Sequence, residues 1–348
     1  MPDSPAPPED ALLTDPPDGR WRPDVLPGFE RSTFEPDETD RGGNLITLVR
    51  PVGTDQHPAA RPVLLIHGWA DYFYNAPLAH ALSDAGYAVY AVDLHRYGRS
   101  LRPGQIPGWT DDLCRYDPDL ETALAKIARH HRPRPTVIAH STGGLVASLW
   151  AHRNPGQLEA LVLNSPWLEM QGSSWVRRLA RTIVDPVAVR RPEAMLRLPK
   201  VDFYWRTLSR DAEGEWDLNR LWRPPYSFDV PAAWLAAVIE GHARVARGLE
   251  IDAPILTLVS GRGMRAARYD AAMHTADVIL DPEAMALRAL RLGRRVTVHR
   301  CDEALHDVFA SRADVRERAL SEMIEWLATY APASERSTAP PYRRSRRA

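Results

Sequence analysis

Apolar runs of strand length alternate with helix-length amphipathic segments over most of this chain, and that alternation restricts the fold more than any other feature. Residues 62–68 and 87–94 are continuous apolar runs of the kind found in strands that are buried on both faces. Residues 117–131 place apolar side chains at helical spacing on one face. Further strands are predicted at residues 136–139, 158–164, 254–259 and 295–300. We therefore predict an α/β fold with a mostly parallel central sheet and helices on both of its faces.

The alternation stops at residue 165 and resumes near residue 254, which divides the chain. Residues 23–165 and 251–331 are predicted to form the core, and residues 166–250 a helical lid inserted into it. Tryptophans in such a segment either form its own core or line an apolar substrate pocket, and the two interpretations are compatible. The inserted segment carries six of the chain's eleven tryptophans: Trp167, Trp175, Trp205, Trp216, Trp222 and Trp234.

The two ends of the chain have the composition of unfolded segments. Residues 1–22 are rich in proline and acidic residues, and residues 332–348 end in a cluster of arginines, so both are predicted to be disordered tails. The chain has neither a signal-peptide pattern nor a run of about 18 apolar residues, which indicates a cytoplasmic protein without a membrane-spanning helix. A formal net charge of −1 gives no indication of a nucleic-acid partner. Cys114 and Cys301 are too few and too far apart for a disulfide framework or a metal site.

Residues 136–145, TVIAHSTGGL, combine a buried strand, a turn of small residues and the start of a helix. This is the strand–turn–helix context of a nucleophile elbow, which holds a serine hydroxyl above the sheet at the N-terminus of a helix. Ser141 is therefore the predicted nucleophile. The motif differs from G-x-S-x-G at its first position, where Ala139 replaces glycine, and alanine is still small enough for such a turn.

Acyl transfer from a serine also requires a base that accepts the hydroxyl proton and an acid that orients the base. In hydrolases with this elbow, the acid and then the base follow the serine along the chain, on loops after late strands. His306 is predicted to be the base because it lies six residues beyond the last predicted strand and just before the last helix. His299 lies within that strand and is interpreted as a structural or surface residue.

Two aspartates follow the strand at residues 254–259 and are candidates for the acid. Asp277 is favoured over its rival Asp270, which lies in a stretch that looks like an insertion, although position alone qualifies both. Asp302 and Asp307 are interpreted as surface charges or helix caps.

An oxyanion hole needs two backbone N–H groups that point at the carbonyl oxygen of the substrate. One is expected from Thr142, the residue after the nucleophile, and the other from Trp69 in the loop after the strand at residues 62–68. His67 is expected to hold the backbone of that loop, because a single histidine beside a glycine is poor evidence for a metal site. The residues themselves therefore give no indication of a metal site.

Six stretches make the chain similar to a known family: LLIHGWADYFYN, VDLHRYGRSL, VIAHSTGGL, LSRD, TADVILDPEA and EALHDVF. They resemble a bacterial monoacylglycerol-lipase and lysophospholipase-like branch of the α/β hydrolases, also described as serine aminopeptidase S33-like, from about Phe29 to Tyr330. The resemblance implies a capped α/β-hydrolase fold, no cofactor, and a triad of Ser141, Asp277 and His306. The chain departs from many relatives at residues 67–72, where HGWADY stands in place of a His-Gly-x-x-Glu-His pattern, and at residues 94–96.

The function predicted from these features is that of a serine hydrolase which cleaves carboxylic esters with an apolar acyl group. The expected partner is a small acyl ester. A prolyl aminopeptidase-like enzyme is the second hypothesis, and it would need lid acids poised for a free amine. The candidate lid acids for this aminopeptidase hypothesis are Glu193, Asp211, Glu213 and Glu215. The third hypothesis is a non-catalytic binding protein on the same scaffold.

Overall fold

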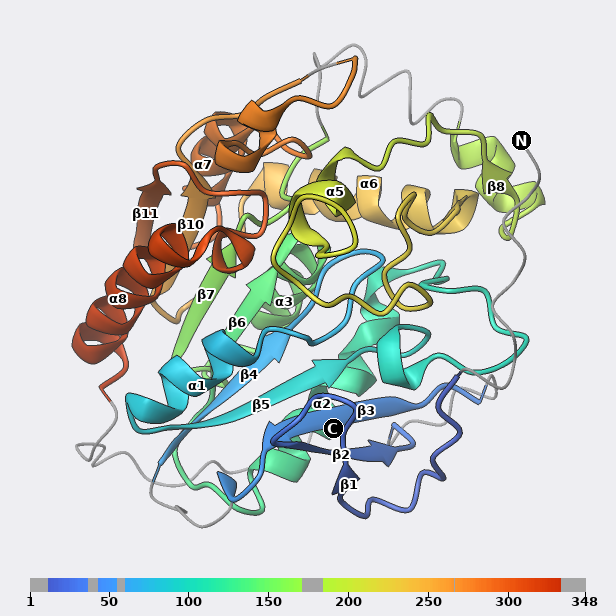
Figure 1. The fold of residues 1–348 in the computed structure, drawn as a ribbon. Helices are drawn as coiled ribbons and strands as arrows, with labels where there is room; N and C mark the ends of the chain where they lie inside the picture. Colours follow the sequence, from blue (N-terminus) through green and yellow to red (C-terminus); the bar gives the residue numbers. More distant parts are fainter. Residues whose placement is uncertain (1–11, 37–42, 55–59, 171–183, 266, 333–348) are drawn as a thin grey trace.

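The computed structural model describes residues 12–36, 43–54, 60–170, 184–265 and 267–332. Within these residues, one sheet contains nine strands in the order β1-β2-β3-β5-β4-β6-β7-β10-β11 (Figure 1). The strands from β5 through β4, β6, β7 and β10 to β11 pair in parallel, whereas β1, β2 and β3 pair antiparallel with one another and β3 with β5. This confirms the predicted mostly parallel sheet. The strands are β1 (Arg22–Pro23), β2 (Phe29–Phe34), β3 (Ile46–Pro51), β4 (Arg61–Ile66), β5 (Tyr87–Asp93), β6 (Thr136–His140), β7 (Ala160–Asn164), β10 (Ile255–Ser260) and β11 (Val296–Cys301).

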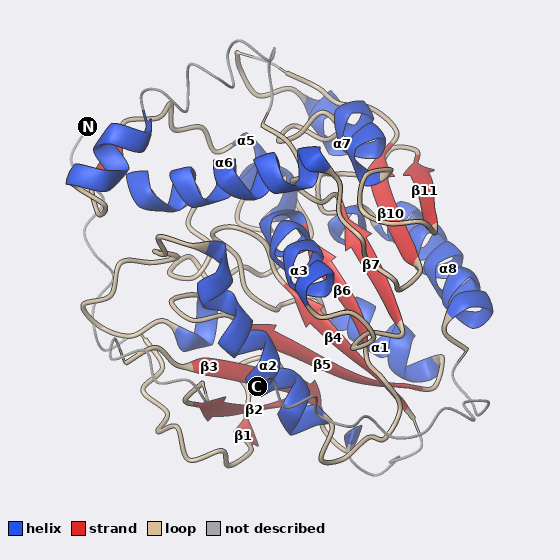
Figure 2. Ribbon diagram, turned by 180° about the vertical axis from the view of Figure 1, so that it is seen from behind, coloured by secondary structure: helices blue, strands red, loops and turns tan. Residues whose placement is uncertain are grey.

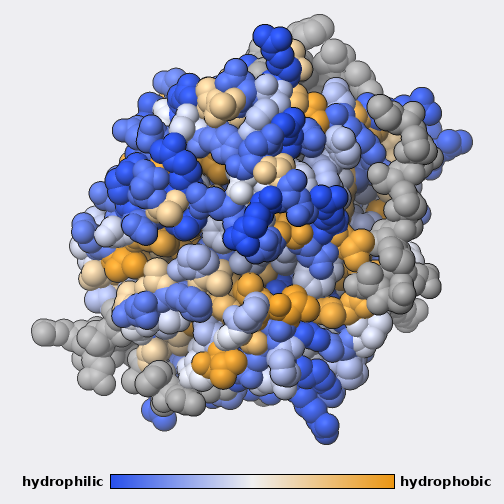
Figure 3. Space-filling model, viewed as in Figure 1, coloured by the Kyte–Doolittle hydropathy of each residue, from blue (hydrophilic) through white to orange (hydrophobic). Residues whose placement is uncertain are grey.

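Helices cover both faces of the sheet. On one face α1 and α8 pack side by side over a cluster of buried side chains, and α2, α3 and α7 cover the other face (Figures 1 and 2). The outer surface on the side of α1 and α8 is largely hydrophilic, as expected of helices that turn their apolar faces inward (Figure 3). The helices are α1 (Ala76–Asp84), α2 (Asp117–Ile127), α3 (Ser141–Arg153), α7 (Pro282–Ala289) and α8 (Ala313–Tyr330).

Burial along the strands explains why their sequences are continuously apolar. Every residue of β4, β6, β7 and β10 is buried, because these strands lie inside the sheet with helices on both faces. Edge strand β11 is only partly buried, and its sequence VTVHRC accordingly mixes apolar and polar residues.

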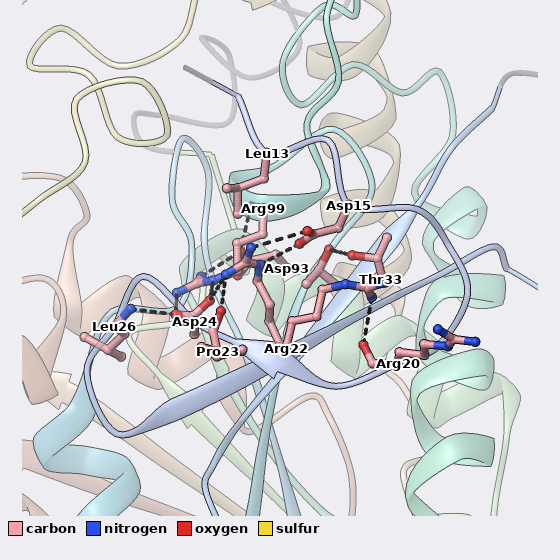
Figure 4. A network of polar contacts seen from close by, with 12 residues as sticks. Leu13, Asp15, Arg20, Arg22, Pro23, Asp24, Leu26, Thr33, Asp93 and Arg99 are labelled. Carbon is pink, nitrogen blue, oxygen red and sulfur yellow. Dashed lines mark hydrogen bonds and ion pairs between the residues drawn. The ribbon is translucent and has the colours of Figure 1, made fainter. Parts of the chain in front are cut away.

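A buried network of charged side chains holds the N-terminal segment against the sheet (Figure 4). Arg99, which is 1% exposed, donates to Asp24 through Nε and Nη2, both at 2.7 Å, and to Asp93 through Nη1 at 2.9 Å. Arg31 on β2 donates from Nε to Asp15 at 2.6 Å. Each buried carboxylate therefore has a guanidinium partner, which compensates for its lost hydration.

The prediction of a disordered tail through residue 22 is therefore wrong for residues 12–22. Leu12 is buried in a cluster with Tyr72 and Trp222, and the polar composition of this segment reflects acids whose arginine partners lie elsewhere in the chain. Residues 1–11 and 333–348, the remaining parts of the two predicted tails, lie outside the described residues.

The described part of the segment predicted as a helical lid, residues 166–170 and 184–250, lies over the carboxyl ends of β4, β6 and β7 (Figure 1). It is less regular than predicted, because long irregular stretches join α5 (Phe203–Leu208) and α6 (Ala232–Arg247) to a small ribbon of β8 (Met195–Leu196) and β9 (Val230–Pro231). Trp175 lies outside the described residues. Among the helices that the structure describes, none has the length and apolarity needed to cross a membrane.

Candidate active site

Ser141 occupies a sharp turn between β6 and α3. Its backbone φ is +51°, in the left-handed region that a residue with a side chain rarely adopts. A Cβ added to Gly143 would lie 2.2 Å from the carbonyl oxygen of His67, and one added to Gly144 would lie 2.8 Å from Cβ of Pro166. The small residues of the motif are thus required because the first turn of α3 passes against neighbouring backbone and side chains.

The structure brings the three predicted triad residues into one hydrogen-bonded chain. With its proton on Nδ1, His306 donates to Asp277 Oδ2 at 2.9 Å, and its Nε2 accepts from Ser141 Oγ at 3.0 Å. The exposed fraction is 2% for His306, 1% for Asp277 and 8% for Ser141. A serine, an imidazole and a carboxylate in this order form the arrangement needed for nucleophilic acyl transfer.

Asp277 is held by its own backbone surroundings. Its Oδ1 accepts hydrogen bonds from the amides of Ile279 at 2.8 Å and Leu280 at 2.7 Å, which leaves Oδ2 for the imidazole. Asp270, the rival acid, is exposed, and its carboxylate caps the short helix η5 (Ala271–Thr275) by accepting from the amide of Ala272 at 2.8 Å.

His299 lies on β11, as predicted, with its side chain 35% exposed and 3.9 Å from Glu322. It takes no part in the hydrogen-bonded chain from Ser141 to Asp277.

The loop after β4 passes directly beside the nucleophile. A Cβ on Gly68 would lie 3.1 Å from Cβ of Ser141, and both Trp69 and Thr142 line the same cavity as Ser141. His67 donates from Nδ1 to the carbonyl oxygen of Gly68 at 2.8 Å and accepts on Nε2 from the amide of Leu94 at 3.1 Å. These two contacts are those expected of a residue that holds the backbone of the loop in place.

A second histidine lies beside the base. The ring of His140 is 4.8 Å from that of His306, and its Nδ1 donates to the carbonyl oxygen of Asn164 at 3.0 Å. Burial lowers the pKa of His140, which keeps the ring neutral near pH 7. A neutral neighbour does not oppose the positive charge that His306 acquires when it accepts the serine proton.

Two further residues lie near His306, and the sequence did not predict that either would lie there. Tyr204 on α5 places its ring 5.4 Å from that of His306, and its hydroxyl accepts from the amide of Asp307 at 3.2 Å. Asp307 is 7% exposed and accepts from Asn164 Nδ2 at 2.6 Å and from the amide of Phe309 at 3.0 Å. Asp307 is therefore a helix cap, which was one of the two interpretations from the sequence, but it is buried rather than at the surface. No sequence pattern predicts that Tyr204 lies near His306.

A cavity of about 500 Å³ opens onto Ser141 and His306. Its few charged residues include Lys200 and Asp229, which pair with each other at 2.8 Å and are more than half exposed. Three of the tryptophans in the inserted segment line this cavity, whereas Trp216 and Trp222 are buried in the cluster beside it. The apolar lining includes Trp167, Trp205, Trp234, Phe228, Leu235, Ile279 and Leu280.

The fold agrees with that of α/β hydrolases among solved structures. A monoacylglycerol lipase of Paleococcus ferrophilus superposes with a TM-score of 0.59 at 22% sequence identity, over 87% of this chain and 99% of that protein. A sequence model of the family described as serine aminopeptidase, S33, matches residues 57–313, and the chain therefore belongs to this family of hydrolases.

Curated relatives match a shorter region. A monoacylglycerol lipase of Mycolicibacterium smegmatis is 31% identical over 124 residues, which cover 35% of this chain and 43% of that protein. A pimeloyl-[acyl-carrier protein] methyl ester esterase of Chromobacterium violaceum is 32% identical over 130 residues, 36% of this chain and 45% of that protein. The matched region thus spans less than half the length of either relative.

Proposed function

We propose that this protein is a serine esterase that hydrolyses carboxylic esters with an apolar acyl group. The observation that carries the proposal is the hydrogen-bonded chain from Ser141 through His306 to Asp277 at the edge of a largely apolar cavity of about 500 Å³. A cavity of this size and lining suits an acyl chain, because apolar surface is removed from water when the chain enters. The similarity to a monoacylglycerol lipase and to an acyl methyl ester esterase points to the same substrate class.

The reaction proceeds through an acyl-enzyme. Ser141 Oγ attacks the ester carbonyl carbon while His306 Nε2 takes the hydroxyl proton, and the carbonyl π electrons move to the oxygen. The amides of Trp69 and Thr142 donate to this oxyanion. His306 then gives its proton to the departing alkoxide oxygen, and the C–O bond to the alcohol breaks. Asp277 fixes the imidazole tautomer and stabilises the imidazolium throughout.

Hydrolysis of the acyl-enzyme follows the same route in reverse. Water attacks the acyl carbon as His306 takes one of its protons, and the tetrahedral intermediate collapses when that proton returns to Ser141 Oγ. The products are a carboxylic acid and an alcohol, and the triad regains its starting protonation.

We further propose that residues 166–250 act as the cap of this site. Within the described part, α5 and α6 and the stretches beside them supply most of the cavity wall. The cap would therefore set which acyl groups fit.

An aminopeptidase activity is less well supported by the cap. Of its four candidate acids, Asp211 pairs with Arg220 at 3.0 Å and Glu213 with Arg206, while Glu193 is exposed. None of the four is among the described residues that line the cavity. A free amine would thus find no unpaired carboxylate of this set beside Ser141.

Labelling with a fluorophosphonate, combined with turnover of p-nitrophenyl butyrate and proline p-nitroanilide, tests the proposal. We expect the wild-type protein to react with the probe and to hydrolyse the ester in preference to the anilide. Ser141→Ala should fold, fail to label, and lose turnover by roughly 10⁶-fold. A Ser141→Ala variant that keeps a tenth of the wild-type rate would contradict the proposal, and preference for the anilide would favour the aminopeptidase.

A further inference from the structure

The turn that carries Trp69 is organised by one buried carboxylate. Asp71 is 3% exposed, and it accepts hydrogen bonds from the amide of Tyr72 at 2.9 Å and, more weakly, from the amide of Gly68 at 3.4 Å. Ala70, inside this turn, has a φ of +48°, which an alanine adopts only when its surroundings hold it there. The position of the Trp69 amide therefore depends on where the Asp71 carboxylate is fixed.

Asp71 is in turn bound by an arginine of the cap. Nη1 of Arg223, which is 6% exposed, donates to Asp71 Oδ1 across 152 positions of sequence. The guanidinium lies 5.3 Å from the ring centres of both Tyr74 and Tyr204. Next to Arg223, the ring of Trp222 packs 5.1 Å from that of Tyr72.

Both members of this pair are charged. Burial alone would raise the pKa of Asp71, but the Arg223 guanidinium, together with the nearby His140 and His67 and the amide of Tyr72, holds that pKa below its usual value. Burial likewise opposes the charge on Arg223, but the Asp71 carboxylate and the nearby acidic groups of Tyr74, Tyr204 and Asp307 together raise the pKa of the guanidinium well above its usual range. A buried ion pair contributes little net stability, since the lost hydration offsets the attraction between its members. Its clearest physical effect is to fix the position of the two segments that it joins.

Other contacts tie the same cap to the two loops of the site. The ring of Trp69 packs 3.7 Å from that of Trp234 on α6. Trp216 Nε1 donates to the carbonyl oxygen of Ala310 at 2.8 Å, close behind His306 in the chain, and its ring lies 5.2 Å from that of Tyr74. The cap therefore contacts both the loop with the oxyanion donor and the loop with the base.

We propose that Asp71 and Arg223 are positioning residues that set the oxyanion hole, so that the Trp69 amide reaches its working position only when the cap is seated on the core. This role rests on the proposed esterase function and adds to it: neither residue reacts, but the pair links the seating of the cap to stabilisation of the tetrahedral intermediate.

The double variant Asp71→Asn/Arg223→Met tests this link without leaving a lone charge in the core. The asparagine can still accept from the Tyr72 amide, but the bond to the cap is lost. We expect kcat for p-nitrophenyl butyrate to fall roughly 10- to 100-fold, less than for outright removal of an oxyanion donor, with KM unchanged within about threefold.

The inhibition constant of an alkyl trifluoromethyl ketone distinguishes the positioning role from a purely structural one, which would leave this constant unchanged. Ser141 Oγ adds to its carbonyl carbon, the proton passes to His306, and the new oxyanion occupies the oxyanion hole. The inhibition constant of this ketone should rise by the same factor by which kcat falls, because both report the same donors.

The matched control is Arg206→Met/Glu213→Gln, which removes another arginine–carboxylate pair of the cap that lies at the surface and outside the cavity lining. It should leave kcat and the ketone inhibition constant within about twofold of wild type.

A folded Asp71→Asn/Arg223→Met protein with wild-type kcat and ketone inhibition would overturn the positioning role. So would a rise in KM alone, which would make Arg223 a substrate contact. If the double variant does not fold, Arg223→Lys decides, because lysine keeps the charge but lacks the planar guanidinium that lies near the rings of Tyr74 and Tyr204. We expect at least a fivefold loss of kcat from it with a matching rise in the inhibition constant, and wild-type values would refute the role. A wild-type protein that neither labels nor hydrolyses esters would instead overturn the esterase function itself, and this role with it.

Discussion

Replacing Asp277 by asparagine separates the orienting role of this residue from its size. Oδ1 of Asp277 accepts from two backbone amides, those of Ile279 and Leu280, at 2.8 and 2.7 Å. An asparagine that turned its NH₂ group toward these donors would lose both hydrogen bonds, at about 1 kcal/mol each or more. The amide oxygen should therefore stay in the Oδ1 position, and the NH₂ group should face His306.

An NH₂ group that donates to Nδ1 of His306 fixes the opposite tautomer. The proton then resides on Nε2, which can no longer accept the proton of Ser141 Oγ. The same exchange in a serine protease triad lowers turnover by about 10⁴, equivalent to about 5 kcal/mol of transition-state stabilisation. We expect a loss of that order from Asp277→Asn, while the melting temperature stays within a few degrees of wild type because the two backbone bonds remain.

Steady-state hydrolysis of p-nitrophenyl butyrate, with thermal melts to verify folding, measures this effect. Asp270→Asn is the matched control: asparagine is as good a cap as aspartate, so the rate should change by no more than a few-fold. A well-folded Asp277→Asn protein with more than a tenth of wild-type activity would refute the tautomer argument. An inactive Asp270→Asn protein would show that the acid had been assigned to the wrong residue of the connection after β10.

Three further outcomes are expected. His306→Ala should abolish ester hydrolysis, whereas His299→Ala should leave kcat/KM within a few-fold, and the reverse result would refute the assignment of the base. Gly143→Ala should lower the free energy of unfolding by roughly 1–3 kcal/mol in urea, because the new Cβ overlaps a backbone carbonyl of the loop after β4; an unchanged midpoint would contradict this. Burial lowers the pKa of His242 from 6.5 to about 4, so the unfolded chain binds a proton more readily and stability falls as the pH drops through this window. About 3 kcal/mol should be lost between pH 7 and 4, and His242→Gln, which can still donate to Trp167, should flatten that part of the profile.

The placement of Ser141 and His306 in the structure was predictable because the signals for both are local. A buried strand, a turn of small residues and a helix follow one another within ten residues around Ser141, and His306 follows the last strand directly. The choice of Asp277 over Asp270 depended on resemblance, because both follow β10 and only the folded loop shows which carboxylate faces the imidazole.

The remaining parts of the site depend on contacts that no local pattern encodes. Arg223 and Tyr204 lie in irregular or short elements, and their partners are 152 and 103 positions away in the chain. The N-terminal segment was misjudged for the same reason, since the acidic composition of residues 12–22 indicates a tail until a distant partner such as Arg31, which donates to Asp15, is placed beside it.

The contacts of the cap with both loops of the site bear on how this protein can be engineered. An inserted segment invites exchange between relatives as an interchangeable module. A cap from a relative would lack Arg223 and Trp216, the partners of Asp71 and Ala310. In such a chimera, the loop that carries Trp69 would lose its contact with the cap. Residues 69–74 and 305–310 would have to be exchanged together with any foreign cap, so the unit of exchange in this protein would consist of three chain segments rather than one contiguous insertion.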